Sequence, residues 1–127
     1  MLALALAVTG CVSGPLQPNP SIDLSGGWRV VALSDERVTG VRYQAEFRGD
    51  NASFRTGCNE SGGSYRVTGG WFVKTSDWIV TTASCGRSEA HRHEKKGLRI
   101  LSEPLAIEHT RKGVRLRNQR GWFDLER

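Results

Sequence analysis

The stretch "GCNESGGSY", residues 57–65, places a cysteine, an asparagine and several glycines close together. Glycine adopts positive φ angles and allows two backbones to approach closely, so glycines are expected where a strand ends. Asn59 can cap a turn through its side chain, and Tyr65 is expected to return to the core face. We predict that the stretch is architectural, with "ESGGS" forming a turn next to Cys58. The alternative is that its polar groups form a ligand site.

The length and composition of the chain allow one soluble domain. The chain has 127 residues, of which 38% are hydrophobic and 24% are charged, as in an ordinary globular protein. Its long apolar run, "MLALALAVTG" at residues 1–10, has about half of the roughly 20 residues that a membrane-spanning helix needs. The length of this run is typical of the core of a signal peptide.

The apolar run ends in "VTGC", Val8 to Cys11, which resembles the lipobox of bacterial lipoproteins. The resemblance implies that Cys11 is lipidated, that residues 1–10 are removed, and that the protein is held at a membrane of the bacterial cell envelope, on the periplasmic side of the outer membrane. The expected Lys or Arg before the apolar core is absent, so the translation start can lie upstream of Met1. The alternative is a chance Gly-Cys pair after an apolar tail.

A proline-containing segment, residues 11–23, follows the lipobox and reads as an extended, semi-rigid tether. At about 3 Å per residue, such a tether could hold the domain up to roughly 40 Å from a membrane anchor. The folded domain is expected over residues 24–127.

Two cysteines remain if Cys11 carries lipid, namely Cys58 and Cys85. Outside the cytoplasm disulfides persist, so we predict that these two cysteines are bonded to each other. A bridge that closes a loop of this length could stabilise the domain by about 3 kcal/mol. The alternative is a pair of free buried thiols. A metal site is disfavoured because two cysteines without CxxC spacing supply too few soft ligands.

Hydrophobic residues alternate with polar ones through most of the chain from Trp28 onward, which predicts strands joined as hairpins. The expected strands are "GWRVVAL", "YQAEF", "ASFRTGC", "YRVTGGWFV", "DWIVTT", "LAIEH", "VRLRN" and "GWFDLE". A helix is expected only over residues 87–101, with Ser84 or Ser88 as its N-cap. Its sparse apolar stripe is Ala90, Leu98 and Leu101. The fold class is therefore mainly β, with one helix.

Three motifs together resemble the META domain of HslJ-like bacterial envelope proteins: "LSGGWRVVAL" (24–33), "GCNESGGSY" (57–65) and "TTASC" (81–85). The most specific match is Gly57-Cys58-Asn59 followed by Gly63 and Tyr65. The sequence departs from the family at Ala83, where a methionine is usual. The resemblance implies a small antiparallel, partly open β-barrel with one helix packed against it. It implies no settled molecular activity.

Candidate catalytic and metal-binding groups are few. In "HRHE", residues 91–94, His91 and His93 lie two apart on the expected helix, so they point in different directions and cannot chelate one ion from the same face. We interpret this stretch as a solvated helix face. A thiol nucleophile at Cys85 is disfavoured by its expected partner, and the serines of "SGGS" lack the strand-to-helix elbow of a catalytic serine. We therefore predict no enzyme, no metal and no cofactor.

Positive charge is concentrated near the C-terminus, because residues 87–127 carry the whole formal excess of +5. If Val114 and Leu116 point into the barrel, period two places Arg115 and Arg117 on the outer face. A basic surface is therefore expected, made of Arg111, Lys112, Arg115, Arg117 and Arg120, with Lys95, Lys96 and Arg99 as possible extensions. An exported protein does not routinely meet nucleic acid, so anionic lipid or acidic glycan is the expected partner. The alternative is a surface that only aids solubility.

These observations favour a lipid-anchored envelope protein that acts by binding or by structural, stress-related support, without catalysis. One alternative is a periplasmic inhibitor of a lytic enzyme. The sequence pI of about 9.6 counts against this role where the target is also cationic. A hydrolase is the second alternative.

Overall fold

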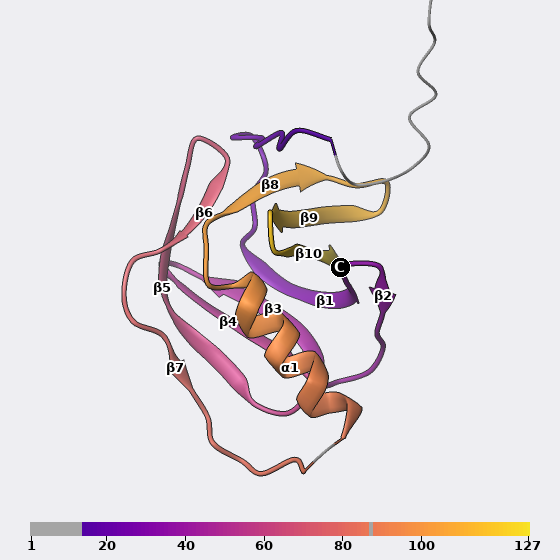
Figure 1. The fold of residues 1–127 in the computed structure, drawn as a ribbon. Coiled ribbons are helices and arrows are strands. Elements are labelled where there is room, and N and C mark those ends of the chain that lie inside the picture. Colours follow the sequence, from indigo (N-terminus) through magenta and orange to yellow (C-terminus); the bar gives the residue numbers. More distant parts are fainter. Residues whose placement is uncertain (1–13, 87) are drawn as a thin grey trace, which may run out of the picture.

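The computed structural model describes residues 14–86 and 88–127. Over this part of the chain it contains strands and one α-helix (Figure 1). The bounds are β1 Gly26–Leu33, β2 Glu36–Arg37, β3 Tyr43–Arg48, β4 Asn51–Thr56, β5 Glu60–Thr68, β6 Trp71–Lys74, β7 Ile79–Val80, α1 Glu89–Ile100, β8 Leu105–His109, β9 Gly113–Asn118 and β10 Gly121–Glu126. Among the described residues, no helix is long and apolar enough to cross a membrane.

Eight of the strands form a closed antiparallel barrel in the order β1, β3, β4, β5, β6, β8, β9 and β10, and β10 pairs with β1 to close the ring. The expectation of a partly open barrel is therefore corrected. Closure is possible because β1 serves two neighbours: residues 26–29 pair with β3 and residues 29–33 pair with β10, with a bulge between Val30 and Ala32. A bulge bends a strand and increases its local twist, which helps a sheet to close on itself.

The barrel interior is filled by aromatic and aliphatic side chains from alternating strand positions. Phe54 lies near the centre of the aromatic cluster, with its ring centroid 5.7 Å from that of Phe47, 6.0 Å from Phe72 and 5.0 Å from Phe123. Tyr65 is buried against Phe47 and Phe72, as expected from the sequence. Such edge-to-face and stacked pairs contribute beyond simple burial of apolar area, by about 0.5–1.5 kcal/mol each.

Two predictions around Trp78, one of a turn and one of a strand, need correction. "ESGGS" is not a turn, because β5 begins at Glu60 and runs straight through it. Of "DWIVTT", only Ile79–Val80 is a strand, paired with β5. The Trp78 indole donates to the carbonyl of Ser64 at 2.9 Å and lies over Gly63, where a Cβ would come within 2.4 Å of the ring. The glycine thus makes room for an aromatic side chain instead of turning the chain.

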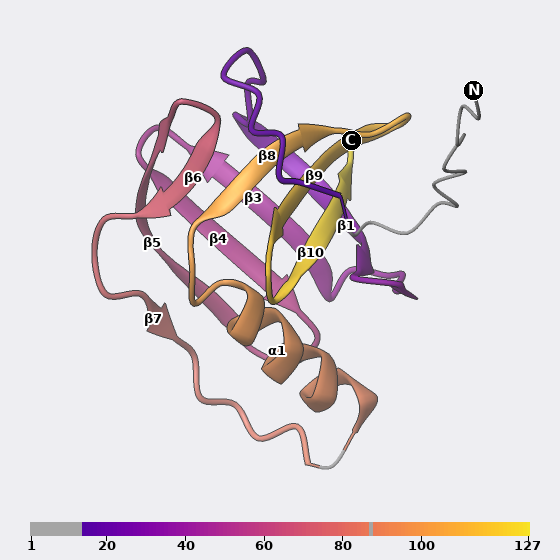
Figure 2. The ribbon, with the colours of Figure 1, turned by 45° about the horizontal axis from the view of Figure 1, so that its top comes forward.

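Helix α1 packs across one end of the barrel against β4, β1 and β10 (Figure 2). Ser88 is the N-cap and accepts a hydrogen bond from the backbone N–H of His91. The buried residues of the helix are His93, Glu94, Gly97 and Ile100. Of the expected apolar stripe, Leu101 is buried at the C-cap, whereas Ala90 and Leu98 are only partly buried. At Gly97 a Cβ would lie 2.3 Å from the Thr56 hydroxyl oxygen, so this glycine lets α1 approach β4 closely.

The described part of the expected tether, residues 14–23, contacts the barrel. The Asn19 N–H donates to the Ile107 carbonyl at 2.8 Å, and the Gln17 N–H donates to the Glu108 carboxylate at 2.8 Å. Ile22 packs against the core. Residues 14–19, called the N-terminal segment below, therefore lie on the outside of β8 and β9 and do not hold the barrel at a distance.

Candidate functional site

The turn between β4 and β5 is joined to the loop before α1 by a disulfide between Cys58 and Cys85, whose Cα atoms are 5.9 Å apart. The predicted cysteine pair is thus present. Asn59 makes a second connection, because its side-chain oxygen accepts from the Ala83 N–H at 2.7 Å and from the Thr81 hydroxyl at 3.0 Å. Its side-chain amide donates back to the Ala83 carbonyl at 3.1 Å. The asparagine therefore holds a second chain segment and does not simply cap its own turn.

The same turn is fitted closely to the helix. Gly57 has a φ of +131°, and a Cβ there would lie 2.1 Å from the Ala90 carbonyl oxygen. The Glu94 carboxylate accepts a hydrogen bond of 2.6 Å from the Asn59 N–H. The disulfide, Asn59 and Glu94 thus fix the turn, the loop and the first turns of α1 as one unit, which we call the helix end of the barrel. The polar groups of "GCNESGGSY" are largely used inside it.

A polar cluster on the inner face of α1 centres on His93, which is 3% exposed. Its Nε2 lies 2.9 Å from the Glu36 carboxylate and its Nδ1 lies 2.7 Å from the Tyr43 hydroxyl oxygen. A carboxylate only accepts, so Nε2 carries the hydrogen, and in the neutral ring Nδ1 accepts from the Tyr43 hydroxyl. The prediction that residues 91–94 form a solvated face is wrong for His93 and Glu94, which are buried, because partners distant in the sequence pair with both.

Glu36 is the acceptor on which this cluster depends. Arg92 binds it with both terminal nitrogens, and the Lys96 ammonium lies 3.2 Å from the same carboxylate. Hydrogen bonds from Arg92, then His93 and Lys96, hold the pKa of Glu36 well below its usual value. The pKa of the Tyr43 hydroxyl is raised, chiefly by burial. These shifts favour a charged Glu36 and a neutral Tyr43, which makes the tyrosine a poor nucleophile.

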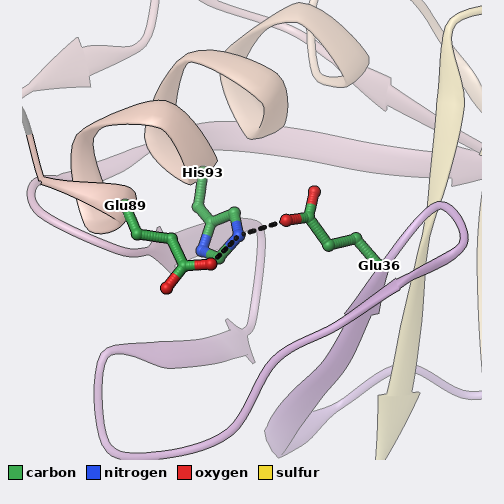
Figure 3. Close-up of side chains that lie close together, drawn as sticks. All are labelled: Glu36, Glu89 and His93. Carbon is green, nitrogen blue, oxygen red and sulfur yellow. Dashed lines mark hydrogen bonds and ion pairs between the residues drawn. The ribbon is translucent and has the colours of Figure 1, made fainter.

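Ligand atoms of Glu36, Glu89 and His93 all lie within 4.8 Å of one another, so they form a group that could hold a cation (Figure 3). The His93 Nε2 is 4.0 Å from the Glu89 carboxylate. The donor set does not suit a metal, however, because Nε2 carries a hydrogen toward Glu36, and Arg92 and Lys96 already neutralise that carboxylate. We interpret the group as an ion-pair network between α1 and the β2 hairpin.

The predicted basic surface divides into paired and unpaired cations. Three arginines face carboxylates: Arg115 Nε lies 2.6 Å from Asp124, Arg117 Nε lies 2.8 Å from Glu108, and Arg120 Nε lies 3.4 Å from Glu103. Val114 and Leu116 are buried as expected. Arg117 is also buried, because the N-terminal segment covers it. The expectation that Arg115 and Arg117 form one exposed surface on β9 is therefore wrong for Arg117.

Two unpaired cations of the expected surface lie at the turn between β8 and β9, and two others, Lys95 and Arg99, are exposed on α1. Arg111 and Lys112 are exposed, and their side chains have no hydrogen bond or ion pair within the described part of the chain. With Arg37 and Arg115 they line a hollow of about 220 Å³, which also includes Asp124 and Glu126. Lys96 is turned toward Glu36 instead, so it does not extend this surface.

A larger hollow of about 550 Å³ lies at the other end of β9 and β10. It is lined by Leu16, Ser34, Arg120 and Trp122, among others. The Trp122 indole nitrogen is buried without a hydrogen-bond partner among the described atoms, and Arg115 lies 4.9 Å from the ring centroid. Cys11, the predicted lipidation site, falls outside the described residues.

The fold and these clusters define a small, disulfide-stapled antiparallel β-barrel with a helix over one end, and none of the described clusters has the arrangement of a catalytic centre. The family model for the META domain matches residues 22–123. The chain belongs to the META domain family.

A search of curated proteins gives no match. Among solved structures, an NMR structure of a protein is similar, with a TM-score of 0.68 over 85% of this chain and 93% of that chain, at 14% identity. At this identity the likeness shows the fold alone.

Proposed function

We propose that this META domain is a non-catalytic binding or structural module of the bacterial cell envelope, carried on a lipid attached to Cys11. The observation that carries the proposal is the disulfide between Cys58 and Cys85. Such bonds form and persist in oxidising compartments outside the cytoplasm and are rare inside it. The "VTGC" sequence at residues 8–11 resembles a lipobox, and the export and anchoring that this resemblance implies agree with this location.

The side-chain clusters support a role without catalysis. Nucleophilic catalysis needs an activated nucleophile beside a base. The hydroxyl bonded to His93 belongs to Tyr43. Burial raises the pKa of this hydroxyl, so it is harder to deprotonate and to activate as a nucleophile. The carboxylate beside His93 is held by Arg92 and Lys96. These groups serve to fix α1 onto the barrel.

The basic turn at Arg111 and Lys112 supports an anionic partner at the envelope surface, such as lipid headgroups. Each basic side chain near an anionic lipid surface contributes about 1 kcal/mol, and the attraction fades within a Debye length of roughly 8 Å at physiological salt. Contact through this turn should therefore weaken as salt is added.

Intact-mass measurement of the membrane-extracted protein tests the anchor. We expect a mature chain that begins at Cys11 and carries acyl groups, and we expect Cys11→Ser to remain unacylated in the soluble fraction. An unmodified wild-type chain in the soluble fraction would contradict the proposal.

A further inference from the structure

The N-terminal segment limits how the barrel can sit on a membrane. Arg117 donates to the carbonyl of Gly14 at 3.0 Å and to the carbonyl of Pro15 at 3.0 Å. The same guanidinium is bound by both oxygens of Glu108, at 2.8 and 2.9 Å. Glu108 in turn accepts from the Gln17 N–H. One buried ion pair thus holds the chain from Gly14 onward on the outside of β8 and β9.

Covalent geometry then places any anchor close to this face. Three peptide units separate Cys11 from Gly14, so their Cα atoms lie within about 11 Å of each other. A lipid on Cys11 would therefore bring the bilayer surface to the outer side of β9 and β10, where Gly14 and Pro15 line the hollow next to Trp122. A free tether of 13 residues would have imposed no such orientation.

The chemistry of the outer face of β9 and β10, called the strand face below, agrees with this placement. Arg115, Arg117 and Arg120 are balanced by carboxylates, so they add little net attraction. Arg37, Arg111 and Lys112 have exposed side chains without described partners, and they border the same strands. Anionic headgroups would supply the missing negative charge, and Trp122 is of the side-chain type that is enriched at membrane–water interfaces.

We propose that the strand face rests on an anionic bilayer, with Arg37, Arg111 and Lys112 toward the headgroups and residues 14–19 as the positioning element. The proposal rests on the lipid anchor proposed above. It commits to a membrane as the occupant of this surface, because the segment that would carry the anchor ends there and because the unpaired charge is positive.

The native lysines report the orientation. The acylated full chain is reconstituted into vesicles that contain anionic lipid, treated briefly with an amine-reactive reagent, and analysed by mass spectrometry for the rate of modification at each lysine. Soluble Cys11→Ser protein provides the reference rates. We expect Lys112 to react several-fold more slowly on vesicles, whereas the exposed Lys95 on α1 and Lys74 on β6 react at their reference rates.

Release of the N-terminal segment provides the second arm. Arg117→Gln, or the milder Glu108→Gln, removes the ion pair that holds residues 14–17, so the Lys112 rate should rise toward its reference value while the acyl mass is unchanged. A cooperative thermal transition shows that each variant is folded. Protection of Lys112 that persists in both folded variants would overturn the positioning role of the segment.

The two proposals fail in different ways. If intact mass shows acylation but Lys112 and Lys95 react alike on vesicles, the orientation is wrong and the anchor stands. If intact mass shows no acyl group, the anchor is wrong and the orientation falls with it. Equal protection of Lys112 on purely zwitterionic vesicles would overturn the role assigned to the three unpaired cations.

Discussion

At the helix end of the barrel, His93 and Glu94 are buried and paired with residues distant in the sequence, whereas Arg37, Arg111 and Lys112 at the border of the strand face are exposed and have no described partners. Glu36 accepts from Arg92, His93 and Lys96 together. By contrast, Arg111 and Lys112 extend from a turn into solvent. The difference indicates that the first region holds the fold together and that the second is available for an external partner.

The comparison also shows how a small barrel compensates for a polar helix. The buried side chains of α1 include His93 and Glu94, which would be costly to bury without partners. The disulfide fixes the turn that supplies the Asn59 N–H to Glu94, and His93 is paired separately with Glu36 and Tyr43. On the strand face the corresponding device is the ion pair between buried Arg117 and Glu108, while Val114 and Leu116 anchor β9 in an apolar core.

The largest effect is expected from loss of the disulfide. Cys58→Ser with Cys85→Ser should lower the free energy of unfolding by about 2–5 kcal/mol, because the bridge constrains the unfolded chain and the loop before α1. Urea titration monitored by tryptophan fluorescence measures the loss. The Gln17 and Asn19 amides should keep their protection, since they donate to Glu108 and Ile107 of β8 and not to the stapled loop.

Reduction of the wild-type protein is the matched control and should reproduce the loss. Thiol labelling of the unreduced, unfolded chain checks the bond itself. Two reactive thiols at Cys58 and Cys85 would contradict both the bond and the division of the molecule into these two regions.

A smaller loss is expected from the buried imidazole. His93→Ala leaves the Tyr43 hydroxyl and one oxygen of Glu36 with one partner fewer, and an unsatisfied buried polar group costs about 1–3 kcal/mol. His91→Ala is the control on the same helix, because the His91 side chain is 41% exposed. We expect the control to change the free energy of unfolding by less than about 0.5 kcal/mol. Equal losses in the two variants would contradict the role given to His93.

Much of the fold follows from local patterns in the sequence, but the polar cluster does not. Period-two alternation predicts β8, β9 and β10 closely, and cysteine parity predicts the bridge. The burial of His93 depends on Tyr43 and Glu36, which lie 50 and 57 residues away. No local pattern in the sequence predicts this pairing.

The errors on the strand face have a similar origin. Alternation correctly places Arg117 on the outer side of β9, yet the side chain is buried because Gly14 and Pro15, more than a hundred residues earlier, cover it. Three prolines in residues 11–23 predict an extended, semi-rigid tether, because composition reports stiffness and not contact. Closure of the barrel likewise depends on the pairing of the first and last strands.

The smallest effect we expect is a dependence of stability on acid, to which both regions contribute. The pKa of Glu36 is lowered from 4.5, first by Arg92 and then by His93 and Lys96. Burial raises the pKa of Glu108, but hydrogen bonds from Arg117 and the Gln17 N–H outweigh it, so this pKa is also lowered. A group with a depressed pKa in the folded state contributes stability that is present above its unfolded pKa and is lost as the pH falls below about 4.5.

The free energy of unfolding should therefore fall as the pH drops below about 4.5, and Glu36→Gln or Glu108→Gln should each make that fall less steep. Hydrogen exchange separates the two regions. Acid should weaken protection of the Gln17 amide in the wild type and in Glu36→Gln, because that amide donates to Glu108. In Glu108→Gln the Gln17 amide should exchange faster already at neutral pH, while protection in α1 is unchanged. A uniform loss of protection across both regions in that variant would mean that the N-terminal segment and the helix end unfold as one unit, and the distinction between them would not hold.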